Sequence, residues 1–234
     1  MDTNTLMMAI WLPIVVAAVI QASFSLSLSV LTLLSGASLA NRQPRRGHGA
    51  LVASYVLGSM VVTAALFVLL AWLFRTIDYW GGDNVTLLVL ISALMTAGFA
   101  VLLFYYRYDP KGTRLWLPRR FAKRLYAVTK QTHSNRGSFL LGGAAVLLEL
   151  VFIIFPLMIA AYLAMSLGGS AYYSAMIVYT LLATSPLIIL ALLYARGRKI
   201  ATIQRWRERN KRFLQLSAGI VMITLSIFLL VYQL

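Results

Sequence analysis

The segment from Leu51 to Phe74 reads LVASYVLGSMVVTAALFVLLAWLF and contains no charged residue. A helix needs about 20 mainly apolar residues to cross the hydrocarbon core of a bilayer, so this segment predicts a transmembrane helix. It belongs to a chain of 234 residues, of which 61% are hydrophobic and 12% are charged. Soluble domains are about 45–50% apolar and about 25% charged. The sequence therefore predicts a membrane protein.

Five further apolar stretches have a comparable length. They run from Leu6 to Leu39, Val85 to Tyr106, Phe139 to Leu167, Ala171 to Tyr194 and Phe213 to Tyr232, and prolines stand inside three of them, at Pro13, Pro156 and Pro186. Six helices and their loops use nearly the whole chain. We predict an all-α fold, a six-helix transmembrane bundle that forms one membrane domain over residues 1–234.

The basic residues are confined to the loops on one side of this predicted bundle. Of the 21 lysines and arginines, 20 lie between helices one and two (42–46), three and four (107–136) or five and six (196–212), and only Arg75 lies on the other side. Positively charged loops stay in the cytoplasm. We therefore expect a multi-pass protein of the cell (inner) membrane with both termini extracytoplasmic. This distribution also argues against nucleic-acid binding, which needs a basic face on a folded surface.

The loop between helices three and four has a pattern of its own. After Pro118, the apolar residues Phe121, Leu125 and Val128 recur at helical spacing among basic residues, with Trp116 nearby. This predicts a basic amphipathic helix on the inner leaflet. Its function is either contact with anionic lipid or docking of an acidic protein partner.

The chain contains no cysteine, which excludes disulfides, thiolate metal sites and thiol redox chemistry. We find no phosphate-binding glycine loop, no nucleophile elbow and no pair of carboxylates. His48, His133, Asp78 and Asp83 lie in loops, and we assign no metal to them. The sequence predicts no enzyme and no cofactor.

The two halves of the chain resemble each other at a nearly constant offset. Three matches have offsets of 124, 125 and 127 residues: Tyr55–Leu57 with Tyr179–Leu181, Ser92–Ala93 with Ser217–Ala218, and Val101–Tyr105 with Phe228–Tyr232. Each half has three helices, so the second half enters the membrane from the opposite face. This predicts an inverted repeat of the kind that many transporters use. Repeat one covers about 6–106, the amphipathic linker 107–138 and repeat two 139–234.

This organisation resembles the cytochrome c biogenesis transmembrane family and its wider lysine-exporter superfamily. The residues that carry the resemblance are Phe24–Leu33 followed by Ser35-Gly36, Glu149–Ala161 with Pro156, and the basic run Arg205–Arg212. The family passes electrons through one cysteine in its first helix and one in its fourth, and the nearest residues here are Ser29 and Ile153. The resemblance thus implies the fold without the thiol relay. Its exporter branches move amino acids or metal ions.

Glu149 is the only carboxylate inside a predicted span. A charged group there costs at least about 2.5 kcal/mol, so Glu149 is our first candidate for an ion-coupling or ion-binding group. The alternative is a neutral Glu149 that shares a hydrogen bond with a neighbouring helix.

Helices one and five supply candidate partners for Glu149. In helix one, five residues share a face, and at the offset of 124 one of them, Ser25, corresponds to Glu149. The alternative for this face is a small-residue packing seam. In helix five, Pro186 frees a carbonyl that nearby hydroxyls or a cation could satisfy, and the alternative is a plain kink. The face of helix one comprises Gln21, Ser25, Ser29, Thr32 and Gly36, and the hydroxyls of helix five belong to Thr180, Thr184 and Ser185.

Two functions follow from these observations. The first is a transporter that moves a small solute or cation by alternating access, with a pathway formed by Glu149, Gln21, Ser25, Ser29, Thr180 and Thr184. The second is a non-transporting membrane scaffold or subunit that binds a protein partner through its basic cytoplasmic loops. The sequence leaves open the substrate, the partner and whether the chain forms a homo-oligomer.

Overall fold

The computed structural model describes residues 3–24, 46–81, 83–106, 134–196 and 210–233, and helices fill nearly all of them. No strand occurs in these ranges. The predicted all-α class is confirmed for this part of the chain. The helices are α1 (Thr3–Phe24), α3 (Arg46–Gly81), α4 (Asp83–Tyr106), α6 (Asn135–Met165), α7 (Gly169–Ala183), α8 (Ser185–Ala195) and α10 (Lys211–Gln233).

Between two and four segments of this fold are long and apolar enough to cross a membrane. Gly49–Ile77 of α3 and Val85–Leu103 of α4 are single helices of that kind. The two halves of α6 form a bent pair that meets the same criterion, and so do α7 and α8. The apolar segments Ala9–Ser23 and Leu216–Val231 are shorter. Each of the six predicted stretches therefore contains a described helix, although this criterion gives fewer spans than six.

The outer surface of the helices is apolar, as a lipid-facing surface requires. Large aliphatic and aromatic side chains are more than half exposed on all seven described helices; examples are Leu57, Trp72, Leu103, Leu140 and Val231. A helix that is apolar both inside and outside the bundle is typical of a membrane span. The class of the molecule is thus a helical membrane protein.

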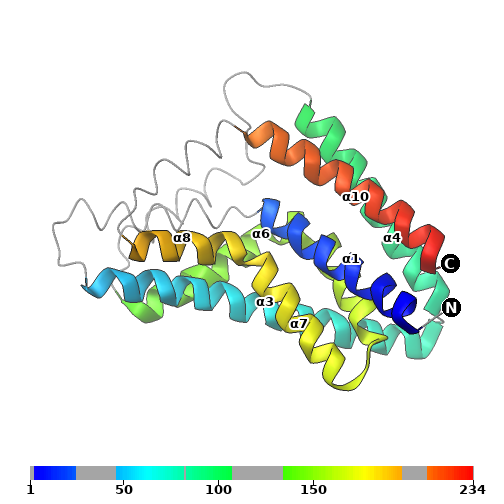
Figure 1. The fold of residues 1–234 in the computed structure, drawn as a ribbon, viewed down its shortest axis with the longest axis horizontal. Coiled ribbons are helices and arrows are strands. Elements are labelled where there is room, and N and C mark those ends of the chain that lie inside the picture. Colours follow the sequence, from blue (N-terminus) through cyan, green and yellow to red (C-terminus); the bar gives the residue numbers. More distant parts are fainter. Residues whose placement is uncertain (1–2, 25–45, 82, 107–133, 197–209, 234) are drawn as a thin grey trace.

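The helices form two closely packed pairs with α1 between them (Figure 1). One pair is α3 with α6, and the other is α4 with α10. Helix α1 packs against α6, α7 and α10. The N- and C-termini lie at the same end of the molecule, together with the ends of α3 and α6. The helix ends that flank the three basic segments lie toward the other end.

Prolines mark the two bends in the fold. The direction of α6 changes by 94° between Leu150 and Ile153, one turn before Pro156. Helices α7 and α8 meet at 56°, with Pro186 in the first turn of α8. A proline removes the hydrogen bond to the carbonyl four residues earlier and its ring clashes with that carbonyl. The sequence predicted a kink at Pro186, and the structure has a break there.

Helices α3 and α6 approach so closely that glycine is required at their contact. A Cβ atom added to Gly58 would lie 2.0 Å from the carbonyl oxygen of Phe139, and one added to Gly142 would lie 2.0 Å from that of Tyr55. Two hydroxyls join the same helices. The Ser59 Oγ donates to the Gly142 carbonyl at 3.1 Å, and the Ser138 Oγ donates to the Leu51 carbonyl at 2.6 Å. These contacts place α3 and the first half of α6 side by side and parallel.

Candidate functional site: a buried polar cluster at a helix break

A buried hydrogen bond joins α1 to α7. The Tyr179 hydroxyl donates to the Gln21 Oε1 at 2.5 Å. Gln21 is 5% exposed and Tyr179 is fully buried, so water does not compete for this bond. Interhelical polar contacts inside a membrane are typically worth about 0.6–2 kcal/mol. Gln21 was a predicted pathway residue, and the structure places it against α7.

The residue after Tyr179 is a threonine whose hydroxyl has no partner. Thr180 is 6% exposed, and its Oγ1 makes no hydrogen bond. The Thr180 carbonyl is occupied, because it accepts from the Thr184 Oγ1 at 2.7 Å and from the Thr184 N–H at 3.1 Å. A buried hydroxyl without a partner costs about 1–3 kcal/mol. Among the buried side-chain polar atoms that the structure describes, this oxygen alone is unsatisfied.

Thr184 occupies the break itself. It ends α7 and begins α8, and it is 3% exposed. The carbonyl that Pro186 frees belongs to Leu182, and the Ser185 Oγ donates to it at 2.7 Å. The predicted use of a nearby hydroxyl is confirmed here. We call Gln21, Tyr179, Thr180 and Thr184 the polar cluster.

Glu149 lies inside the bundle. It is 5% exposed, so its carboxyl group does not face the apolar outer surface. It follows Gly142 by seven residues, or two helical turns, and therefore lies on the same side of α6. Ala145, on the same face, is buried as well, and so is Ile153 just after the bend.

Two predicted pathway residues, Ser25 and Ser29, lie outside the described residues, as do Thr32 and Gly36 of the same predicted face. The amphipathic linker helix with Phe121, Leu125 and Val128 also lies outside them. The correspondence of Ser25 with Glu149 thus remains a prediction.

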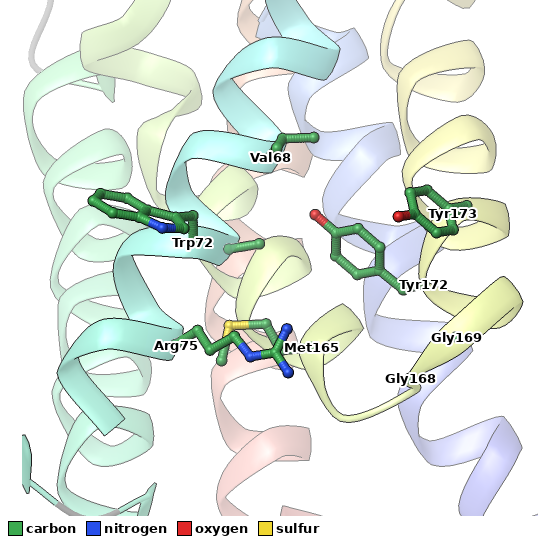
Figure 2. A pocket seen from close by; sticks show the side chains of 9 residues that line it. Val68, Trp72, Arg75, Met165, Gly168, Gly169, Tyr172 and Tyr173 are labelled. Carbon is green, nitrogen blue, oxygen red and sulfur yellow. The ribbon is translucent and has the colours of Figure 1, made fainter. Parts of the chain in front are cut away.

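A cavity of about 380 Å³ opens at the end of the bundle where the chain termini lie. Figure 2 shows its walls, formed by the last turns of α3, the end of α6 and the start of α7. The lining residues are Val68, Ala71, Trp72, Arg75, Met165, Gly168, Gly169, Tyr172 and Tyr173. We call it the Arg75 cavity.

One aromatic side chain connects the Arg75 cavity with the polar cluster. The ring centroid of Phe67 lies 6.2 Å from that of Tyr172, which lines the cavity, and 5.3 Å from that of Tyr179. Phe67 is fully buried. Phe67 thus packs against one ring that lines the cavity and one ring that belongs to the cluster.

The sequence did not single out Tyr179 or Phe67 as site residues. Tyr179 was used only as a marker of the repeat, although its position next to Thr180 was a signal for a polar role. Phe67 is one apolar residue within an apolar stretch and gives no signal in the sequence. The cavity residue Arg75 was visible only as the exception to the charge distribution.

The chain matches no protein-family model, and comparisons with curated proteins and with solved structures found no match either. The class of the chain comes from its fold and its site. It is a helical membrane protein with two to four candidate spans and a buried polar cluster at a broken helix.

Proposed function

We propose that the chain is a transporter that moves a small solute or cation by alternating access between two three-helix halves. The polar cluster and Glu149 form the pathway in this proposal. The proposed fold is the predicted inverted repeat, related to the cytochrome c biogenesis and lysine-exporter families. The proposed orientation puts the basic segments in the cytoplasm.

The packing of the helices supports the inverted repeat. In such a repeat α1 corresponds to α6, α3 to α7 with α8, and α4 to α10. Each of these corresponding helices packs against its counterpart. The contact of α3 with α6 then corresponds to that of α7 with α1, and the contact of α1 with α10 to that of α6 with α4; all four occur. Tyr55 and Tyr179, which match in the two halves, are both fully buried.

The break between α7 and α8 supports a binding site. Transporters of this architecture bind substrate and ions where membrane helices are discontinuous, because the interrupted helix ends expose polar backbone groups inside the membrane. Here the break lies at Thr184, and the polar residues gather around it rather than at the bundle surface.

The unpartnered Thr180 hydroxyl is the observation that carries the proposal. Folding leaves a buried hydroxyl unsatisfied only at a cost, and a residue that only held helices together would have a partner. A solute or hydrated cation in the cluster would accept or donate the missing hydrogen bond. The free energy that the unpaired Thr180 hydroxyl costs in the empty protein is regained when a solute or cation occupies the cluster.

The absence of native cysteine makes a direct test available. Thr180→Cys gives a chain with one thiol, and a membrane-impermeant methanethiosulfonate reagent is applied to right-side-out and to inside-out vesicles. Alternating access predicts that the thiol reacts from both sides, since the open states are populated minor states. The readout is the rate of labelling of the purified protein.

Thr63→Cys is the matched control. Thr63 is likewise a buried threonine, 0% exposed on α3, and its Oγ1 donates to the Ser59 carbonyl within the same helix at 2.8 Å. We expect no labelling of this variant from either side. Labelling of Thr180→Cys from neither side, or at the rate of the control, would contradict transport and favour the scaffold that binds a protein partner through its basic loops.

A further inference from the structure

The Arg75 cavity has a polar end and an apolar end. Arg75 and Trp72 are exposed on α3, and across the gap stand the rings of Tyr172 and Tyr173 on α7 (Figure 2). Toward the middle of α3 the wall consists of Val68 and Ala71. The wall formed by α3 is therefore charged at the Arg75 end and apolar at the Val68 end.

The position of the cavity along α3 matches the boundary of a bilayer. The apolar window of α3 ends at Ile77, two residues after Arg75. Val68 lies seven residues before Arg75, about 10 Å deeper along the helix axis. Tryptophan and tyrosine gather at the level of lipid headgroups, and Trp72, Tyr172 and Tyr173 all line this cavity.

The charge of Arg75 is not neutralised by any side chain that the structure describes, and no acidic residue is among those that line the cavity. Asp78 follows three residues later, and its side chain lies outside the described part. A guanidinium group binds phosphate with two parallel hydrogen bonds. Figure 2 draws the hydroxyls of Tyr172 and Tyr173 toward the Val68 end of the cavity, so they are not donors to a phosphate held by Arg75.

We propose that the Arg75 cavity binds an anionic phospholipid, with the phosphate at Arg75 and an acyl chain along Val68 and Ala71. The cavity volume lies within the range of about 300–1,000 Å³ found for ligand pockets. Val68 and Trp72 line the cavity and are also exposed on the apolar outer surface of α3, which favours a lipid over a soluble anion. The ammonium group of a zwitterionic lipid would lie in the same cavity as the positive charge of Arg75, and no carboxylate is among the lining residues that the structure describes.

Trp72 reports on this site directly. The full-length protein is placed in phosphatidylcholine vesicles that contain a small fraction of phosphatidylglycerol with a dibrominated, fluorescence-quenching acyl chain. The contribution of Trp72 is the difference between the wild type and Trp72→Phe. We expect Trp72 to be quenched more than the mole fraction of brominated lipid predicts, and we expect Arg75→Gln to reduce the quenching to that of random mixing.

Arg136→Gln is the matched control, because Arg136 is an exposed arginine at the start of α6, toward the opposite end of the molecule. It should leave the excess quenching unchanged. Arg75→Lys, which keeps the charge without the two-pronged geometry, should give an intermediate value. In Val68→Trp, the contribution of Trp72 is again the difference between proteins with and without Trp72→Phe. The larger side chain should fill the apolar end of the cavity and remove the excess quenching of Trp72, although Arg75 remains.

Three results would overturn the proposal. The first is the same excess quenching in Arg75→Gln as in the wild type. The second is an equal excess when the bromine is carried by phosphatidylcholine, which would mean that the aromatic residues recognise the headgroup. The third is complete displacement by soluble glycerol phosphate, which would make the cavity a site for a free anion. This binding assay does not depend on transport, so it can fail while the transport proposal stands, and the reverse.

Discussion

Tyr179 shows how one residue can be found in a sequence and its role still be missed. Its match with Tyr55 at an offset of 124 made it part of the predicted repeat, and both side chains are fully buried. Its hydrogen bond to Gln21 depends on which faces of α1 and α7 meet. Sequence spacing gives the residues that share a face of one helix, whereas the neighbouring helix is set by packing. Gln21 could therefore be predicted as an inward-facing residue, but not its partner.

The residue that bears most directly on the coupling mechanism is Glu149. Glu149→Gln keeps the shape and most of the hydrogen-bonding capacity and removes the titratable proton. We expect a folded protein in which the rate of Thr180→Cys labelling no longer varies with pH. The measurement is that rate divided by the rate for the exposed reference Ser170→Cys, because thiol reactivity itself depends on pH.

Glu149→Asp supplies the control for this prediction, since it retains a carboxyl group and should retain a pH dependence. A Glu149→Gln protein whose normalised labelling still follows pH as in the wild type would show that Glu149 only bridges helices.

At the scale of elements, the contact between α3 and α6 is the part of the fold most sensitive to added volume. Gly58→Ala would place a methyl group against the Phe139 carbonyl, and neither backbone can yield without separating the helices. We expect a destabilisation of about 1–3 kcal/mol, the usual cost of overpacking. Thermal or denaturant unfolding of the purified protein in detergent measures it.

Gly49→Ala, on the same helix, is the matched control because nothing lies within 4 Å of the added Cβ atom. It should leave stability unchanged or raise it by up to about 1 kcal/mol, since alanine favours a helix more than glycine does. Equal effects of the two substitutions would mean that the close approach contributes no stability.

The elements differ in how far the sequence predicts them. The apolar stretch 85–106 predicts helix α4 closely, because a membrane span requires every backbone hydrogen bond to be made within the helix. Helix α3 extends five residues before and seven beyond the predicted 51–74, so the prediction that His48 and Asp78 lie in loops was wrong. A kink was predicted at Pro186, where α7 and α8 meet, but no bend was predicted at Pro156 in α6. Prolines mark both bends. They could not predict angles of 94° and 56°, which depend on the helices packed around each bend. The glycine contact of α3 with α6 was not predicted, since a glycine inside an apolar stretch shows no partner.

At the scale of the whole molecule, the placement of the helix ends suggests a test of sidedness. We expect reporter tags at residues 44, 125 and 205 to be cytoplasmic and tags at 80, 169 and 234 to be extracytoplasmic, because basic loops are retained in the cytoplasm. Protease or dye accessibility of tags in intact cells measures this. A cytoplasmic tag at 234 together with an extracytoplasmic N-terminus would exclude an even number of crossings.

The charge distribution carried most of what could be predicted at this scale. It assigned 20 of 21 basic residues to one side without any knowledge of packing. The helix ends next to those segments do lie toward one end of the molecule (Figure 1). The arrangement of the helices into the pairs α3–α6 and α4–α10 could not be predicted, because apolar faces of membrane helices are chemically alike.

The length of α3 has a consequence for the bilayer around the protein. Its apolar window, Gly49–Ile77, has 29 residues and is about 43 Å long at 1.5 Å per residue, whereas the hydrocarbon core of a bilayer is about 30 Å thick. The excess is accommodated by tilting the helix or by a locally thicker membrane. Sterol-rich or long-chain bilayers reduce this hydrophobic mismatch, and short-chain bilayers increase it. The tilt of α3, and with it the depth of the cavity at its end, is thereby coupled to the thickness of the surrounding membrane.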